Sequence, residues 1–247
     1  MFANFLRPNS LFGRIIRIPL RLIPSETQLR IIFGKNKGKK WMVGSGVHSY
    51  WIGCYEKTKQ KMFSDYVSEG NVVYDIGANV GFYTLLASGL VGSKGLVVAF
   101  EPAPKNIDFL KRHLSINNLS NILVVESAVS DKDGYEYFDK GPNGSMGRLK
   151  TDGDIQVKTL TLDHFISELN TPLPDILKID IEGAEMLALK GAIKLLNEKH
   201  PVVFLATHGQ DIHRECCDLL TDIGYKVSPI DSKPLEYSKE VIAYFDK

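Results

Sequence analysis

The stretch from Val72 to Gly81 constrains the fold of this chain more than any other. Val72 to Ile76 are β-branched or apolar around one aspartate, which is typical of a strand buried on both faces of a parallel sheet. Gly77 and Gly81 then bracket a tight turn, and apolar residues at helical spacing resume at Phe82. A strand, a glycine turn and a helix in this order predict a nucleotide-binding crevice, because backbone can approach the ligand and a helix N-terminus faces it.

The turn does not follow the glycine pattern of dinucleotide-binding folds. That pattern needs a second glycine two residues after Gly77, where this chain has Asn79. An aspartate at the strand end followed by Gly-x-Asn-x-Gly better suits a nucleoside with an amino-acid tail, such as S-adenosylmethionine. Asp75 would pair with the amine, and the turn backbone would take the carboxylate. The alternative is a structural strand-to-helix turn that binds no ligand.

Further residues fit the rest of such a ligand. A second buried strand is predicted over residues 95–100, and it is closed by Glu101, which is placed to accept hydrogen bonds from ribose hydroxyls. Ser127 and Ala128 follow the third predicted strand, residues 122–125, at a place where an adenine ring would lie. The glycine-rich stretch 141–147 is predicted to be a mobile loop and a lid over an acceptor site.

A second informative stretch runs from Ile176 to Gly183 and ends a buried strand with two carboxylates. Asp180 and Glu182 are two residues apart, so in an extended conformation they face the same side. Such a pair can accept a proton, orient an acceptor hydroxyl or bind a hard divalent cation. For Glu182, the alternative is a role at the N-terminus of the helix predicted over residues 184–196.

His208 follows the fifth predicted strand, residues 202–206. Its ordinary pKa suits proton acceptance near neutral pH, so it is a candidate general base or acceptor-orienting group, although a lone histidine is more often structural. Asp163 is predicted to cap a short helix. Two terminal strands, 224–228 and 241–245, would form an antiparallel hairpin at the sheet edge.

Size and charge exclude several classes of protein. A chain of 247 residues with a net charge of +1 is long enough for one α/β domain with an extension, and gives no general reason to expect nucleic-acid binding. Its cysteines, Cys54, Cys216 and Cys217, are too few for a disulfide framework or a zinc site. A reducing, cytoplasmic compartment is therefore expected.

Residues 1–40 are basic and hydrophobic, with Glu26 as their single acid. They contain neither a run of roughly 20 apolar residues nor the cleavage site of a secretory signal. The segment is predicted either to pack on the domain or a second subunit, or to lie on an anionic membrane surface. Residues 41–70 are rich in aromatics and glycine and are predicted to cap the crevice or form a satellite core, which leaves residues 71–247 as the main domain.

Together these motifs resemble the FkbM-type S-adenosylmethionine-dependent methyltransferases. The similarity covers roughly residues 70–210 and is carried by Tyr74–Thr84 (YDIGANVGFYT), Phe100-Glu101-Pro102, Thr161-Leu162-Asp163 and Leu177–Glu185 (LKIDIEGAE). Ala206-Thr207-His208 stands where the family usually has an acidic residue, so the resemblance assigns no metal ligands here.

The resemblance implies a class I methyltransferase fold, Rossmann-like and doubly wound, with a mostly parallel sheet of seven strands. It places Asp75, Gly77, Asn79 and Gly81 at the methionine end of the donor and Glu101 at the ribose. The expected reaction is O-methylation of a sugar, glycoconjugate or other small-molecule hydroxyl. The alternatives are a non-catalytic nucleoside-binding protein and an NAD-dependent oxidoreductase. A divalent metal is compatible with this chemistry but has no support in the sequence.

Overall fold

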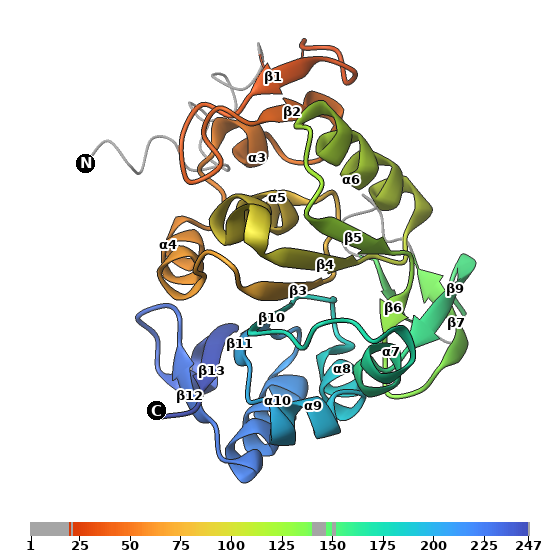
Figure 1. The fold of residues 1–247 in the computed structure, drawn as a ribbon, viewed down its shortest axis with the longest axis vertical. Coiled ribbons are helices and arrows are strands. Elements are labelled where there is room, and N and C mark those ends of the chain that lie inside the picture. Colours follow the sequence, from red (N-terminus) through yellow and green to blue (C-terminus); the bar gives the residue numbers. More distant parts are fainter. Residues whose placement is uncertain (1–19, 21, 140–146, 150–151, 247) are drawn as a thin grey trace. The chain divides into compact units, whose positions relative to one another are not determined.

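The chain divides into two compact units, residues 1–55 and 56–247 (Figure 1). The computed structural model describes residues 20, 22–139, 147–149 and 152–246. Residues 1–19 and 21 of the basic segment 1–40, which is predicted to contact a membrane or to pack on the domain or a second subunit, lie outside the described residues. These alternatives stay predictions. In the part of the chain that the structure describes, no helix has the length and apolar character needed to span a bilayer.

The first unit contains a short strand pair and two helical turns. Its elements are β1 (Gln28–Arg30), β2 (Lys40–Met42), the 3-10 helix η2 (Val43–Ser45) and α3 (His48–Ile52). Trp41 and Tyr50 are buried with ring centroids 5.5 Å apart, and Tyr55 meets Tyr50 edge to face at 4.7 Å. The predicted aromatic segment therefore contains an aromatic cluster, and its function as a cap stays a prediction.

The second unit is built around a sheet of seven strands. In sheet order these are β12 (Lys226–Pro229), β13 (Glu240–Tyr244), β11 (Val202–Ala206), β10 (Ile176–Ile179), β3 (Val72–Ile76), β4 (Leu96–Phe100) and β5 (Ile122–Val125). Neighbours from β11 to β5 run parallel, and β13 is antiparallel to β11 and β12. The prediction of an α/β fold with a mostly parallel seven-stranded sheet is confirmed.

The strand order reverses beside β3, because the chain continues to β4 and β5 on one side and returns to β10 on the other. In open α/β sheets, ligands bind outside the carboxyl ends of the strands at such a switch point. The residues that follow β3, β4, β10 and β11 are therefore brought to one edge of the sheet, which is where the predicted site residues lie.

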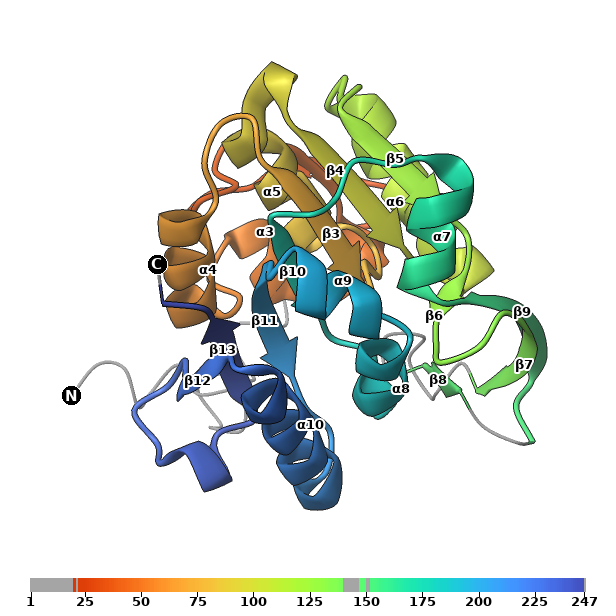
Figure 2. The same ribbon diagram turned by 60° about the horizontal axis from the view of Figure 1, so that its bottom comes forward.

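Helices cover both faces of this sheet (Figures 1 and 2). On one face lie α4 (Lys57–Tyr66), α5 (Phe82–Val91) and α6 (Pro104–Ile116), and on the other lie α7 (Leu162–Leu169), α8 (Glu185–Lys190), α9 (Ile193–Glu198) and α10 (Gln210–Ile223). Successive strand residues point to opposite faces. Tyr74 consequently packs against Phe165 of α7, whereas Asp75 faces Thr84 of α5.

A smaller sheet and two 3-10 turns complete the second unit. The sheet has the order β6 (Ala128–Val129), β9 (Ile155–Leu160), β7 (Gly134–Asp139) and β8 (Arg148–Leu149), and the turns are η3 (Gly92–Lys94) and η4 (Leu235–Tyr237). The glycine-rich stretch predicted to be a lid lies between β7 and β8 and, apart from Gly147, outside the described residues.

Two local predictions are wrong. The single helix expected over residues 184–196 is divided into α8 and α9 at Gly191, where a Cβ atom would lie 2.0 Å from the carbonyl oxygen of Ser130. Asp163 does not cap its own helix, because Thr161 occupies the N-cap of α7. The Asp163 carboxylate instead accepts the backbone N–H groups of Lys194 and Leu195, both at 2.9 Å, in the first turn of α9.

Candidate active site

The turn after β3 is held in shape by close backbone contacts. Gly77 and Gly81 have φ angles of 76° and 93°, in the left-handed region that favours glycine. A Cβ on Gly77 would lie 2.0 Å from the carbonyl oxygen of Asp180, and one on Gly81 would lie 2.5 Å from Leu110 Cδ1. Asn79, with φ 51°, accepts the Val80 N–H at 2.7 Å on its side-chain oxygen. The turn thus packs directly against the end of β10.

The N–H groups of this turn are already paired within the chain. Those of Gly77 and Ala78 donate to the Phe100 carbonyl at 3.0 and 2.9 Å, and that of Gly81 donates to the Ala78 carbonyl at 2.8 Å. The turn backbone was expected to take the carboxylate of the donor, but in this structure its N–H groups are engaged elsewhere.

Asp75 is buried and has partners inside the protein. Thr84 donates its hydroxyl to Asp75 Oδ2 at 2.7 Å, and the Lys178 ammonium lies 3.2 Å from Oδ1. Lys178 is opposite Asp75 in the register of β10 with β3 and also donates to the Gly77 carbonyl at 3.1 Å. An internal ammonium therefore lies where the sequence predicts the amine of the ligand, and a contact between Asp75 and the donor stays a prediction.

Glu101 is likewise buried at the end of β4, with 4% of its surface exposed. Its Oε2 accepts the Asn79 N–H at 2.8 Å, and its Oε1 accepts the Ala103 N–H at 2.9 Å and the Asn106 amide at 3.1 Å. Burial raises the pKa of Glu101, and these hydrogen bonds act in the opposite direction. A carboxylate has about four acceptor positions, so one remains for a ribose hydroxyl.

The residues predicted at the adenine lie beside this group. Ser127 and Ala128 are buried, with 3% and 8% of their surface exposed, and Ala128 begins β6. Ala128 packs with Ala103 and Phe138 in a small apolar cluster. An apolar environment of this kind suits a heterocyclic base, and the assignment of these two residues to the adenine stays a prediction.

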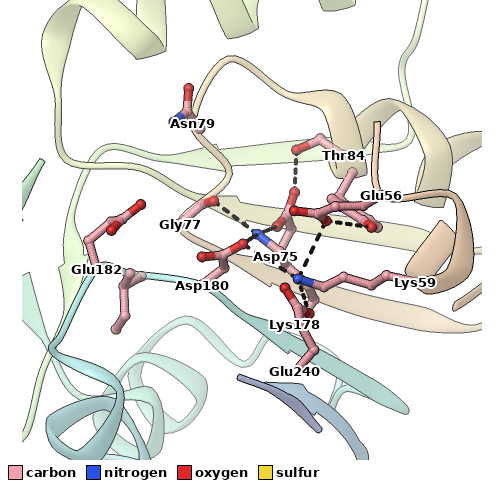
Figure 3. A network of polar contacts seen from close by, with 12 residues as sticks. Glu56, Lys59, Asp75, Gly77, Asn79, Thr84, Lys178, Asp180, Glu182 and Glu240 are labelled. Atoms are coloured by element: carbon pink, nitrogen blue, oxygen red, sulfur yellow. Dashed lines mark hydrogen bonds and ion pairs between the residues drawn. The ribbon is translucent and has the colours of Figure 1, made fainter. Parts of the chain in front are cut away.

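Asp180, the first residue after β10, lies between two lysines. Its Oδ2 is 3.6 Å from the Lys59 ammonium of α4 and 3.9 Å from that of Lys178 (Figure 3). Burial disfavours the charged carboxylate, but Lys59, Lys178 and His208 outweigh that effect and lower the pKa of Asp180. Asp180 is therefore an anion held in a fixed position at the carboxyl ends of the strands.

Lys59 is a buried cation shared by three carboxylates. Its ammonium lies 2.6 Å from Glu240 Oε2 of β13, 3.6 Å from Glu56 Oε2 and 3.6 Å from Asp180 Oδ2, and 3% of its side chain is exposed (Figure 3). Burial opposes its charge, but these carboxylates prevail and raise the pKa of Lys59. Tyr83 of α5 adds a hydrogen bond to Glu56 at 2.9 Å. α4 is thereby connected to the ends of β10 and β13.

His208 and Glu182 also lie close to Asp180, and His208 is near the oxygen that the lysines do not approach. His208 Nε2 is 3.4 Å from Glu182 Oε2 and 3.9 Å from Asp180 Oδ1, and one ligand atom from each residue lies within 4.8 Å of the other two. Glu182 has φ 55°, so it is not in the extended conformation that the sequence predicts, yet it still converges with Asp180. The N-cap of α8 is Ala184, which rules out N-capping by Glu182.

A buried carboxylate, that of Glu185, supports the positions of His208 and of the turn at Glu182. Glu185 is fully buried, and its Oε1 lies 2.9 Å from His208 Nδ1 and accepts the Gly183 N–H at 3.0 Å. This hydrogen bond raises the pKa of His208, while burial acts in the opposite direction. The strained turn at Glu182 and the orientation of the imidazole therefore depend on one side chain.

The sequence did not predict four of these side chains as part of the site: Lys59, Lys178, Glu185 and Glu240. Lys178 had a detectable signal, because a lysine inside an otherwise apolar predicted strand needs an acidic partner. Lys59 and Glu240 had none, because each lies in a charged surface-like segment and is brought here by tertiary packing. Glu185 belongs to the strand-end motif, but its burial depends on how α8 packs.

Comparison with known proteins assigns these motifs to a family. The sequence matches the "Methyltransferase FkbM domain" over residues 75–227. It is 27% identical over 153 residues to hexuronic acid methyltransferase AglP of Haloferax volcanii, a match that covers 61% of this chain and 62% of AglP. It is 23% identical over 189 residues to methyltransferase 1 of Beauveria bassiana, covering 67% of this chain and 72% of that one. The match thus spans less than two thirds of AglP.

Solved structures show the same fold. A methyltransferase FkbM from Methylobacillus flagellatus superimposes with a TM-score of 0.53 and 18% identity, covering 79% of this chain and 52% of that chain. A precorrin-6y C5,15-methyltransferase from Geobacter metallireducens gives a TM-score of 0.51 and 17% identity, covering 77% of this chain and 90% of that one. The predicted class I methyltransferase fold is confirmed.

Proposed function

We propose that this chain, which belongs to the FkbM methyltransferase family, is an S-adenosylmethionine-dependent enzyme that methylates a hydroxyl oxygen of a sugar, glycoconjugate or other small molecule. S-adenosylmethionine supplies a methyl group on a positively charged sulfur, which an oxygen nucleophile can attack. Family membership speaks against the oxidoreductase alternative, and a measured turnover is what would exclude a protein that only binds the nucleoside.

The observation that carries the proposal is the contact between the turn after β3 and Asp180. The Asp180 N–H donates to the Ile76 carbonyl at 3.1 Å, and its own carbonyl leaves no space for a side chain on Gly77. The group proposed to bind the acceptor therefore adjoins the turn proposed to bind the donor. Holding two reactants in a productive orientation contributes roughly 7–11 kcal/mol of a reaction barrier.

The donor-side residues fit a cationic nucleoside. Side chains at Gly77 and Gly81 would collide with Asp180 and Leu110, so the two glycines keep the turn compact, and Glu101 retains acceptor capacity for a ribose hydroxyl. The surrounding carboxylates also favour a ligand with positive charges over an anionic one. Asp75, Gly77, Asn79 and Gly81 would lie at the methionine end, Glu101 at the ribose, and Ser127 and Ala128 at the adenine.

Asp180 and His208 are the candidates for removing the proton of the acceptor hydroxyl. Both are partly exposed, with 21% and 33% of their side chains accessible, so a ligand can reach them. The lysines keep Asp180 ionised, and Glu185 keeps the His208 ring in place. General base catalysis of this kind contributes about 10²–10⁴-fold to the rate.

A sugar acceptor is supported by the similarity to hexuronic acid methyltransferase AglP. At 27% identity this supports a class of acceptor and not a particular one, so the test needs a panel. Hexuronides, neutral hexosides and simple alcohols are incubated with methyl-labelled S-adenosylmethionine, and methyl ethers are identified by mass spectrometry. An O-methylated sugar would support the proposal, whereas N- or C-methyl products alone would contradict it.

Donor binding is tested separately by titrating S-adenosylhomocysteine and NAD calorimetrically. We expect the first to bind and the second not to bind. Glu101→Gln preserves the shape of the side chain but removes a charged acceptor, so binding of S-adenosylhomocysteine should weaken by about 10–100-fold. Glu215→Gln, an exposed position on α10, is the matched control and should leave the affinity unchanged. Equal loss in both variants would contradict the role of Glu101.

A further inference from the structure

Three side chains of types that can bind a metal converge after the ends of β10 and β11. Asp180 and Glu182 come from the β10 side and His208 from the β11 side, and their ligand atoms lie within 4.8 Å of one another. The exposed fractions of their side chains are 21%, 28% and 33%, so the space between them is accessible from solvent. Each contributes an atom with a lone pair to the same small volume.

The imidazole is oriented with its free nitrogen toward the two carboxylates. An ionised carboxylate can only accept hydrogen bonds, so the contact of 2.9 Å between Glu185 Oε1 and His208 Nδ1 places the ring proton on Nδ1. Nε2 of the neutral ring then presents its lone pair to Asp180 and Glu182. Metal-binding histidines are usually held in this way, by a carboxylate on the other ring nitrogen.

Two lysines orient the Asp180 carboxylate so that its other oxygen faces His208. Lys59 and Lys178 both approach Oδ2, at 3.6 and 3.9 Å, whereas Oδ1 is the oxygen nearer His208. The lysine contacts therefore fix the carboxylate without occupying the oxygen that faces the cluster.

A buried carboxylate beside the cluster, that of Glu185, is incompletely paired. Glu185 is fully buried, and its Oε2 has no hydrogen-bond partner among the described residues. Lys59 and Lys178 lie within ion-pair distance of Asp75, Asp180, Glu56 and Glu240, whereas the described ion-pair partner of Glu185 is His208. A buried carboxylate that is incompletely paired favours a bound cation nearby.

We propose that a divalent transition-metal cation binds between Asp180 Oδ1, Glu182 Oε2 and His208 Nε2. Ligand atoms at right angles around an ion with bonds of about 2.1 Å lie about 3 Å apart. The observed separations of 3.4 and 3.9 Å from Nε2 come close to that value and close further by small rotations of partly exposed side chains. The set of two oxygens and one nitrogen suits Mn²⁺, Fe²⁺ or Zn²⁺ better than Ca²⁺ or Mg²⁺, which prefer oxygen alone.

Three protein ligands leave further coordination positions of the ion open. If the protein methylates a hydroxyl as proposed above, a hydroxyl bound there would have a lowered pKa. That role rests on the proposed function, but the site itself does not. Asp180 and His208 would then act as ligands and not as general bases.

The competing arrangement is a protonated His208, whose imidazolium would itself be the cation between the three acids. The two arrangements differ in a measurable way. A metal site takes up Mn²⁺ from solution and loses it when a ligand is removed, whereas an imidazolium excludes the ion from the same place.

The test is a titration of the full chain with Mn²⁺, followed by the electron paramagnetic resonance signal of the free ion, without donor or acceptor. We expect one ion per chain, bound at least tenfold more weakly by Glu182→Gln and by His208→Gln. Glu185→Gln should weaken binding by about 10–100-fold through the imidazole. Glu215→Gln should bind as the unchanged protein does, and circular dichroism establishes that every variant is folded.

The absence of Mn²⁺ binding by folded protein, or binding that is equal in all four variants, overturns the site. Binding of S-adenosylhomocysteine is measured on the same samples. Donor binding without Mn²⁺ binding would reject only the metal site, and Mn²⁺ binding without methyl transfer to any acceptor would reject only the proposed function.

Discussion

The site at the carboxyl ends of the strands has two halves, and the acidic side chains of the two halves differ in burial and in pairing. At the ends of β3 and β4, Asp75 and Glu101 are buried, and their oxygens meet fixed donors of the same chain. At the ends of β10 and β11, Asp180, Glu182 and His208 stay partly exposed and face one another. In the first half most of the carboxylate contacts are made within the fold, whereas the second half keeps its charged groups accessible.

The difference suggests that the ends of β3 and β4 form a rigid binding site, whereas the ends of β10 and β11 carry the groups for the reaction. A donor that is always the same molecule can be met by a turn fixed through backbone contacts. If Asp180 and His208 deprotonate the acceptor as proposed, their side chains must stay available to it. The buried Lys59, Lys178 and Glu185 hold them in place. Stability should therefore depend mostly on the holding residues, and turnover on the groups they hold.

The largest expected effect is that of Asp180→Asn on turnover. We expect methyl transfer to fall by about 10²–10⁴-fold, because the carboxylate is lost as a base or as a ligand. Affinity for S-adenosylhomocysteine should change little, since Lys178 keeps Asp75 and Lys59 keeps Glu240 as partners. Rates come from labelled methyl transfer and affinities from calorimetry. A loss of donor binding as large as the loss of rate would remove the distinction between the two halves.

The next effect concerns stability. Lys59→Met should lower the free energy of unfolding by about 3–5 kcal/mol, because Asp180, Glu240 and Glu56 lose the buried cation they share. The control is Lys61→Met on the same helix, where an exposed pair with Asp65 contributes at most about 1 kcal/mol. Urea unfolding measures both. Similar losses in the two variants would show that the network is not a buried one.

A third effect concerns the half of the site at the ends of β3 and β4, which is proposed to bind the donor and is called the donor half below. It is measured through the pH dependence of stability. His113 is buried, with Nδ1 2.7 Å from the Val80 carbonyl in the turn, and burial lowers its pKa to about 4. The unfolded chain, with a histidine pKa of about 6.5, binds this proton more readily. Stability contributed by the neutral ring is therefore complete above pH 6.5 and is lost as the pH falls towards 4, by about 3 kcal/mol.

The measurement is the difference in unfolding free energy between the wild type and His113→Gln at several pH values. The difference should shrink in the acid range, since only the wild type carries the titrating ring. A constant difference from pH 7 to pH 4 would mean that His113 titrates normally in the folded protein.

Much of the fold could be predicted from the sequence. The strands at 72–76, 122–125 and 202–206 have the predicted bounds, because β-branched runs between turn residues have few other structures open to them. The location of Asp180 and His208 at the same end of the sheet could be predicted for a related reason, because the carboxyl ends of parallel strands lie together. Their catalytic role stays a prediction.

The contacts that hold the site residues in place could not be predicted from the sequence. Lys59 is 121 residues from Asp180 and 181 from Glu240 along the chain, and its helix has the composition of an exposed one. The break between α8 and α9 depends on the Ser130 carbonyl, which lies far from Gly191 in sequence. Periodicity describes one element at a time, so it identifies neither the partner of a buried charge nor a backbone that approaches from another element.

The smallest expected effect compares two asparagines with similar left-handed backbones. Asn79 in the turn has φ 51°, and Asn170 at the C-cap of α7 has φ 47°. Glycine relieves the strain at either position but adds freedom to the unfolded chain, so each Asn→Gly change should alter stability by less than about 1 kcal/mol. Asn79→Gly additionally loses the hydrogen bond to the Val80 N–H at 2.7 Å, which holds the turn.

The two variants should therefore differ in donor binding more than in stability. We expect Asn79→Gly to weaken the affinity for S-adenosylhomocysteine, since a more mobile turn must be ordered again when the ligand binds, and Asn170→Gly to leave it unchanged. Calorimetric titration of both variants decides this. If both retain full affinity, the shape of the turn does not depend on Asn79, and the contacts of Gly77 and Gly81 alone keep the donor half rigid.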